Sequence, residues 1–226
     1  MEIIHTETPA TDAGKELSKL LAMYKELPVL LLVSGGSAFS VLTYCDSAFL
    51  DSRITLGVLD ERYSKDPKIN NFSQLRETSF FKIAEEKEVI IINSEIQENE
   101  TREELASRLD KILKEWVMTY PEGKILVTMG IGEDGHTVGI LPHTDTNFSD
   151  EKFVISYVIP ETSNLHTERI TVTYTFLQNH VNEAIVYAVG DAKKKILGEL
   201  QDETSQLSDM PASVLKTMKS VKIFTE

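Results

Sequence analysis

Three short segments of this 226-residue chain combine glycines with polar or charged side chains that could do chemistry. The richest is Gly130–His136 (GIGEDGH), in which a carboxylate, Asp134, lies two residues before an imidazole, His136. Histidine is the side chain whose proton affinity suits a general base near neutral pH. Three glycines within six residues are costly in ordered structure, so they indicate a backbone shaped around a ligand. We therefore expect the chemistry at this segment, with Asp134 holding the ring or sharing the proton transfer.

The second segment is Ser34-Gly35-Gly36-Ser37, which follows an apolar run and precedes a helical pattern. Glycines let the backbone approach a ligand closely, and the start of a helix offers unpaired N–H groups to an anion. The hydroxyl groups of Ser34 and Ser37 add donors. The pattern fits a phosphate site, but by itself it fits an ordinary strand-to-helix turn equally well.

The third segment, Asp60-Glu61-Arg62, also ends an apolar run. An arginine at the mouth of a sheet can bind phosphate through two parallel hydrogen bonds, while a neighbouring carboxylate orients a reacting group. A surface ion pair is the simpler interpretation of these three residues taken alone. Their significance depends on whether the fold brings them near the other two segments.

Other classes of site fit this sequence poorly. Gly130–Gly135 reads literally as GxGxxG, but Glu133 and Asp134 inside the turn would repel a pyrophosphate, and the next predicted strand, Phe153–Ile159, has no acidic residue for a ribose. Nicotinamide binding is therefore not expected. No metal-ligand spacing links the remaining polar candidates, which are His5, Cys45, His143, His166 and His180.

Short apolar runs rich in β-branched residues alternate with helical patterns along the whole chain. This alternation predicts an α/β fold, a Rossmann-like open sheet that is mostly parallel and has helices on both faces. Ligands bind beyond the carboxyl ends of the strands in such sheets. We expect a single domain over residues 1–226. The predicted strands are Pro28–Ser34, Arg53–Asp60, Glu88–Ser94, Lys124–Gly130, Phe153–Ile159, Arg169–Thr175, Ala184–Gly190 and Val221–Thr225, and the predicted helices are Thr11–Lys25, Ala38–Asp46, Asn71–Phe81, Thr101–Tyr120 and Ala192–Leu200.

Composition narrows the range of partners. The formal net charge of −13 disfavours nucleic acid and anionic membranes, which bind clustered lysine and arginine. The single cysteine, Cys45, cannot form an internal disulfide, and no apolar run reaches the roughly 20 residues of a membrane span. Without a signal-peptide pattern either, we expect a cytoplasmic protein. An anionic ligand would need a few local cations and backbone amides to hold it against the overall charge.

Read in order, the segments SGGS, LDERY (Leu59–Tyr63) and GIGEDGHTVGILP (Gly130–Pro142) resemble the 6-phosphogluconolactonases, and more distantly the glucosamine-6-phosphate deaminases. The segments ERITVTY (Glu168–Tyr174), VGDAKKKIL (Val189–Leu197) and MPASVL (Met210–Leu215) also fit the lactonase pattern. The GxGxDGH loop is the most specific element of this resemblance, which spans the chain from about residue 31 to 215.

The resemblance implies hydrolysis of 6-phospho-D-glucono-1,5-lactone to 6-phosphogluconate in the pentose phosphate pathway, without a metal or organic cofactor. His136 would then take a proton from water, Asp134 would orient the base or the sugar, and Asp60 would lie close by. The family pattern also implies a phosphate and sugar pocket made of Ser34, Gly35, Gly36, Ser37, Arg62, Arg169 and Lys193.

The chain departs from the lactonase pattern at a few positions. Ala38-Phe39 replaces the usual Thr-Pro after SGGS. After the catalytic loop, Gly139–His143 (GILPH) stands where the family usually reads SLFPG, so that His143 replaces a glycine. Asn71 matches an asparagine that follows the DER segment in the family. These changes leave the proposed catalytic atoms in place and put the fit of the substrate in question.

Two other functions stay open. A glucosamine-6-phosphate deaminase would use similar proton chemistry, but deaminases usually carry a Glu-Pro pair after the catalytic loop. The corresponding stretch here, Ile140-Leu141-Pro142-His143, has no carboxylate. A non-catalytic sugar-phosphate-binding protein could share the fold, although it would not need both Asp134 and His136. The sequence allows a monomer or a homodimer.

Overall fold

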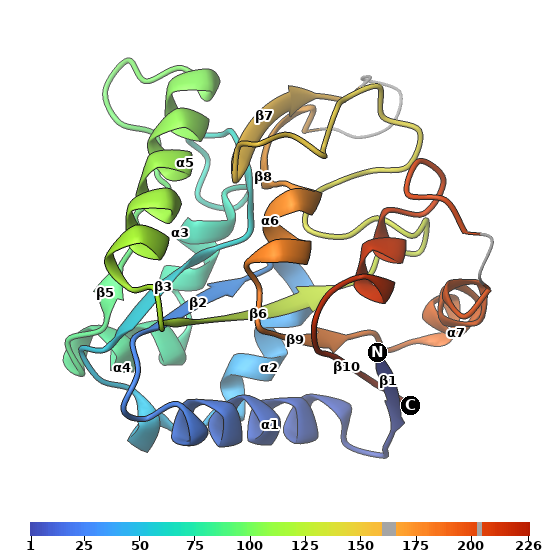
Figure 1. The fold of residues 1–226 in the computed structure, drawn as a ribbon, viewed down its shortest axis with the longest axis horizontal. Helices are drawn as coiled ribbons and strands as arrows, with labels where there is room; N and C mark the ends of the chain where they lie inside the picture. Colours follow the sequence, from blue (N-terminus) through green and yellow to red (C-terminus); the bar gives the residue numbers. More distant parts are fainter. Residues whose placement is uncertain (160–165, 203–204) are drawn as a thin grey trace.

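The main element of the fold is a seven-stranded sheet in which all neighbouring strands are parallel (Figure 1). The structure is a computed structural model that describes residues 1–159, 166–202 and 205–226. The sheet confirms the predicted α/β class with a mostly parallel, open sheet. In spatial order its strands are β1 (Glu2–His5), β10 (Val221–Thr225), β9 (Glu183–Tyr187), β6 (Lys124–Gly130), β2 (Val29–Val33), β3 (Ile54–Val58) and β5 (Ile90–Ile91).

The order of the strands reverses between the two central parallel strands, β2 and β6. The next strand of the sheet after β2 is β3 on one side, whereas the next after β6 is β9 on the other side. Such a reversal opens a crevice at the carboxyl ends of the two strands, and this is where open α/β sheets bind ligands. The segments Ser34–Ser37 and Gly130–His136 begin at these two ends.

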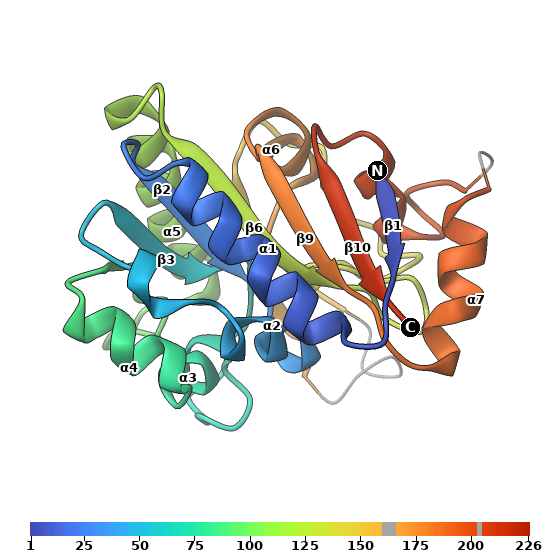
Figure 2. The same ribbon diagram turned by 90° about the horizontal axis from the view of Figure 1, so that it is seen from below.

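Helices cover both faces of the sheet, as Figure 2 shows from below. Strand β2 is buried along its whole length, and its side chains alternate between two cores. Leu30 and Leu32 face the core under one set of helices, and Leu31 and its neighbours Val29 and Val33 face the other. The second of these faces packs against α1 (Pro9–Met23), α2 (Phe39–Thr43), α3 (Asn71–Arg76) and α4 (Ser79–Glu86), and the first against α5 (Arg102–Thr119), α6 (Tyr174–Asn179) and α7 (Asp191–Leu200).

Three strands form a second, antiparallel sheet in the order β4-β8-β7. They are β4 (Asp60–Arg62), β8 (Glu168–Val172) and β7 (Val154–Val158). The runs Phe153–Ile159 and Arg169–Thr175, predicted as strands, lie in this second sheet, and Asp60–Arg62, expected at the end of a strand, forms a short strand of its own. The local pattern shows that a segment is extended, but the choice of partner strand depends on contacts far along the chain.

Most predicted helices are present with altered ends. The predicted helix Thr101–Tyr120 is present as α5 and begins with a capping box, in which Thr101 and Glu104 each accept a hydrogen bond from the other's backbone N–H. The predicted helix Asn71–Phe81 is two helices, because Thr78 takes an extended conformation and its side chain accepts a hydrogen bond from Phe81 N. Elements β1, α6 and the 3₁₀ turn at 211–216 were not predicted. Within the described residues, no helix is both long and apolar enough to cross a bilayer.

Candidate active site

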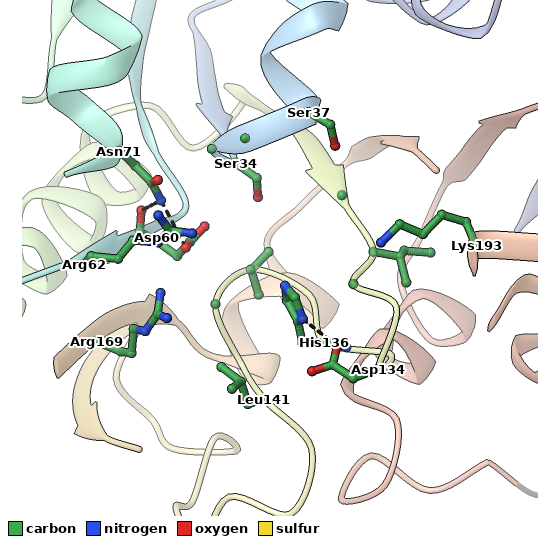
Figure 3. A pocket seen from close by; sticks show the side chains of 17 residues that line it. Ser34, Ser37, Asp60, Arg62, Asn71, Asp134, His136, Leu141, Arg169 and Lys193 are labelled. Atoms are coloured by element: carbon green, nitrogen blue, oxygen red, sulfur yellow. Dashed lines mark hydrogen bonds and ion pairs between the residues drawn. The ribbon is translucent and has the colours of Figure 1, made fainter. Parts of the chain in front are cut away.

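A cavity of about 290 Å³ opens at the crevice between the ends of β2 and β6 (Figure 3). All ten residues predicted for the site line it, although they come from five separate parts of the chain. The cavity is also lined by residues that were not predicted for the site, among them Ile131, Val138, Gly139 and Leu141. The predicted residues are Ser34, Gly35, Gly36, Ser37, Asp60, Arg62, Asp134, His136, Arg169 and Lys193.

The Ser34–Ser37 segment presents unpaired donors to the cavity. Ser34 N continues the pairing of β2 with β6 by donating to the carbonyl of Thr128 (2.9 Å), and the chain then turns into a short 3₁₀ helix that begins at Gly36. Among the described residues, the N–H groups of Gly35, Gly36 and Ser37 find no acceptor, and the buried Oγ of Ser34 has no hydrogen-bond partner. Buried polar groups are normally paired, so these donors indicate that the segment is built to receive an acceptor.

Gly35 allows this segment to lie directly against Asn71. A Cβ atom at Gly35 would lie only 2.2 Å from Oδ1 of Asn71, so no larger residue fits. The side-chain amide of Asn71 donates to the carbonyl oxygen (2.9 Å) and to the carboxylate (3.1 Å) of Asp60. Asn71 therefore links the start of α3 to β4. The match of Asn71 to the family asparagine was the signal for this residue in the sequence.

One face of the small sheet forms a charged wall of the cavity. Asp60 lies opposite Thr171, and Arg62 lies opposite Arg169, so these four side chains share a face. Figure 3 shows Arg62, Arg169 and Asp60 on one side of the cavity and Lys193, from the first turn of α7, on the other. The Nε groups of Arg62 and Arg169 are buried and have no hydrogen-bond partner among the described residues.

Burial and charge oppose each other on this wall. Burial raises the pKa of Asp60, while the nearby Arg62, Arg169 and His136 act to lower it. Burial also lowers the pKa of Arg169, and the like charge of Arg62 lowers it further. Two guanidinium groups next to one buried carboxylate leave an excess of positive charge, which suits an anionic ligand.

Glu61 faces away from the cavity. It alternates with Asp60 and Arg62 along β4 and is only 1% exposed. Its carboxylate accepts hydrogen bonds from four donors: the backbone N–H groups of Arg62, Asn71 and Phe72 and the hydroxyl of Ser94. Burial raises the pKa of Glu61 to about 8, although the hydrogen bonds from α3 and Ser94 act to lower it. Glu61 therefore links β4 to the start of α3 through these hydrogen bonds.

The loop after β6 holds the imidazole and the carboxylate together. Nδ1 of His136 lies 2.6 Å from Oδ1 of Asp134, which also accepts a hydrogen bond from His136 N (3.0 Å). This pairing lowers the pKa of Asp134 to about 2. Gly132 makes room for it, because a Cβ atom there would lie 2.0 Å from Nδ1 of His136. A carboxylate only accepts hydrogen bonds, so in the neutral ring Nδ1 carries the proton and Nε2 keeps a free lone pair.

Two of the positions at which the chain departs from the lactonase pattern, Phe39 and His143, lie outside the cavity lining, whereas Gly139 and Leu141 are part of it. Phe39 packs against the core beneath α2 and does not line the cavity. His143 is exposed, adopts a left-handed φ of 55°, and lies 3.4 Å from Asp209. A left-handed position favours glycine, which accounts for the usual glycine here in the lactonase pattern. Over residues 1–159, 166–202 and 205–226, no group of three or more His, Cys, Asp or Glu side chains is arranged to hold a metal ion.

Comparison with known proteins places this geometry in a family. The chain is 26% identical over 181 residues to a probable 6-phosphogluconolactonase from Dictyostelium discoideum, covering 79% of this chain and 75% of that protein. A 6-phosphogluconolactonase structure from Shewanella baltica OS155 shares the fold, with a TM-score of 0.79 at 19% identity over 100% of this chain and 97% of that one. A monomeric glucosamine-6-phosphate deaminase does so with a TM-score of 0.71 at 18% identity, over 100% and 97% of the two chains. The family model for glucosamine-6-phosphate isomerases and 6-phosphogluconolactonase matches residues 8–224, so the chain belongs to this family.

Proposed function

We propose that this protein hydrolyses 6-phospho-D-glucono-1,5-lactone to 6-phosphogluconate, as a carboxylic ester hydrolase of the pentose phosphate pathway. The observation that carries the proposal is the 2.6 Å contact between His136 and Asp134 at the edge of a cavity lined by cations and unpaired N–H groups. A base, an anion-binding surface and room for a sugar are the requirements of this hydrolysis.

His136 acts as the general base, and no metal activates the water. As the water oxygen bonds to C1 of the lactone, Nε2 of His136 takes a proton from it, and the carbonyl oxygen becomes an oxyanion. When the carbonyl re-forms, the bond from C1 to the ring oxygen breaks, and His136 returns the proton to that departing oxygen. Asp134 stabilises the imidazolium between the two steps and keeps the ring in the correct tautomer.

The phosphate group binds between the Ser34–Ser37 segment and the cationic side chains. Unpaired backbone N–H groups suit phosphate oxygens, and arginine can donate two parallel hydrogen bonds to them. Arg62, Arg169 and Lys193 supply the local positive charge that a chain of net charge −13 needs to hold an anion.

The cavity supports lactone hydrolysis better than deamination. Deamination needs further proton transfers between C1 and C2, and the deaminase pattern places a glutamate after the catalytic loop. Leu141 occupies that part of the wall here, and the only carboxylates among the described lining residues are Asp60 and Asp134. A protein that only binds sugar phosphates would have no use for the paired His136 and Asp134.

Three further proposals concern the protein as a whole. Residues 1–226 act as one enzyme domain, the protein works in the cytoplasm without an organic cofactor, and it is a monomer or a homodimer. The shared cavity supports the first, because it takes side chains from β4 and β8 as well as from the loops after β2 and β6.

The direct test is hydrolysis of freshly generated 6-phosphogluconolactone, followed by proton release, with His136→Ala as the control. Such lactones also open spontaneously, so the enzyme rate must exceed both the buffer and the variant. We expect His136→Ala to lose most of the catalysis, roughly 10²-fold or more, and to bind sugar phosphate almost normally.

Each outcome of this test has a clear meaning. A wild-type rate equal to the spontaneous rate would reject the lactonase, and ammonia release from glucosamine 6-phosphate would then separate a deaminase from a binding protein. Full activity in His136→Ala would leave the lactonase standing and reject His136 as its base.

A further inference from the structure

A strained turn follows the catalytic histidine and forms part of the cavity wall. Thr137 N donates to the carbonyl of Ile140 (3.3 Å), and Ile140 N donates to the carbonyl of Thr137 (2.8 Å), which closes a tight turn. Its two central residues, Val138 and Gly139, have φ angles of 44° and 74°. A β-branched residue is an outlier in this left-handed region, and such strain costs of order 1–3 kcal/mol. Strained backbone of this kind concentrates at functional sites.

Two buried hydroxyl groups from the small sheet hold the turn. Thr171 Oγ1 donates to the carbonyl of Val138 (2.6 Å), and the hydroxyl of Tyr157 donates to the carbonyl of Gly139. Thr171 is fully buried, and Tyr157 is 4% exposed. Both turn carbonyls are therefore directed toward β7 and β8.

The direction of the carbonyls determines the direction of one amide. In a planar trans peptide the C=O of Val138 and the N–H of Gly139 point in opposite directions, so this N–H points away from Thr171. Among the described residues, neither Val138 N nor Gly139 N has a hydrogen-bond acceptor, although both residues line the cavity. Gly139 also lies next to the charged wall, since a Cβ atom on it would lie 2.9 Å from the carboxylate of Asp60.

A fixed, unpaired backbone donor is what an oxyanion site requires. Donors that are held in place before the reaction stabilise the developing charge without reorganising, and removing one costs roughly 10²–10³ in kcat. The turn begins at the residue after His136, so the donor and the proposed base belong to one short segment. Thr137 Oγ1 also donates to the carbonyl of Gly130 (2.8 Å), which ties the start of the turn to β6.

We propose that the N–H of Gly139 is the oxyanion donor of the hydrolysis, and that Tyr157 and Thr171 are positioning residues that aim it. This inference rests on the proposed lactonase activity. The N–H donates a hydrogen bond and no proton: the carbonyl oxygen gains its negative charge as the water oxygen bonds to C1, and loses it when the ring C–O bond breaks.

The test compares Tyr157→Phe and Thr171→Val with wild type on 6-phosphogluconolactone. We expect each variant to lower kcat by about 10- to 100-fold with little change in KM, because the donor acts on the transition state and not on the bound lactone. Binding of glucitol 6-phosphate, which has no carbonyl group, should stay at the wild-type level. The pH profile of kcat/KM should keep its shape, because the proposed base is untouched.

Two further variants separate positioning from general damage. Thr171→Ser keeps the hydroxyl and should restore most of the rate. Tyr174→Phe is the matched control, because Tyr174 packs against the same Phe148 ring as Tyr157 but does not bond to either turn carbonyl. Its kcat should match wild type.

The outcomes that would reject the lactonase activity differ from those that would reject only the oxyanion donor. An inactive wild-type enzyme would reject the proposed function itself. An active wild type with unchanged kcat in folded Tyr157→Phe and Thr171→Val would reject only the oxyanion donor. A raised KM with normal kcat, or an equal loss of kcat in Tyr174→Phe, would also overturn it.

Discussion

At the scale of single residues, the site is made by side chains that leave room for one another. His136 and Asp134 can pair at 2.6 Å only because residue 132 is glycine, and Asn71 can reach Asp60 only because residue 35 is glycine. The glycines that marked these loops in the sequence thus serve two purposes. They shape the backbone, and they make space for polar side chains that no alanine would leave.

Replacing Arg62 tests whether this side chain binds the phosphate group of the proposed substrate. We expect Arg62→Ala to lower kcat/KM for 6-phosphogluconolactone by roughly 10- to 100-fold, because a hydrogen bond to a charged group contributes about 1.5–3 kcal/mol. The unphosphorylated lactone should lose far less. Rates on both lactones give the ratio directly, with Arg76→Ala as control, since Arg76 is exposed and pairs with Glu95 outside the cavity. Equal losses on both substrates would mean that Arg62 does not bind the phosphate.

At the scale of elements, the local sequence predicted two strand ends of the site but neither the small sheet nor the turn after His136. The ends of β2 and β6 were predictable, because long apolar runs followed by glycine identify both the strand and its carboxyl end. The small sheet could not be predicted, because nothing in a short run such as Asp60–Arg62 indicates which strand it pairs with. The Val138–Gly139 turn was hidden for a different reason: valine disfavours a positive φ, so only tertiary contacts reveal it.

The junction of β4 with α3 depends on Glu61 and makes stability depend on pH. The carboxyl of Glu61 has a pKa of about 8 when folded, against an ordinary value of 4.5. Between these values the folded protein binds more protons at this group than the unfolded chain does. The free energy of unfolding therefore falls as pH rises through the window, by at most about 1.4 kcal/mol per pH unit from this group.

Urea unfolding of wild type and Glu61→Gln at pH 5, 6.5 and 8 measures this contribution. Wild type should lose more stability than the variant as pH rises, because glutamine does not titrate. The variant should also be less stable at pH 5, since glutamine has one accepting oxygen and an NH2 group that only donates, so it cannot accept from both Asn71 N and Phe72 N, which bond to different oxygens of Glu61. Parallel pH dependences in the two proteins would show that Glu61 does not titrate in this window.

At the scale of the whole molecule, the cavity concentrates positive charge in an acidic protein. Arg62, Arg169 and Lys193 come from β4, β8 and α7, and the chain as a whole has a net charge of −13. Two of these cations lie opposite each other with buried, unpartnered Nε groups. Two like charges held next to each other repel, and an anion that bonds to these groups should stabilise the fold that brings the three elements together.

Thermal unfolding with the reaction product measures this stabilisation. At a hundred times its Kd, 6-phosphogluconate should add about 2.7 kcal/mol, and at roughly 2–4 °C per kcal/mol for a chain of this size Tm should rise by about 5–10 °C. Gluconate at the same concentration lacks the phosphate and should raise Tm by less than about 2 °C. The product should still stabilise Arg76→Ala, whose changed charge lies outside the cavity, while Arg62→Ala should show a smaller shift. Similar shifts with gluconate and 6-phosphogluconate would mean that the cavity binds the sugar acid and that its cations do not select phosphate.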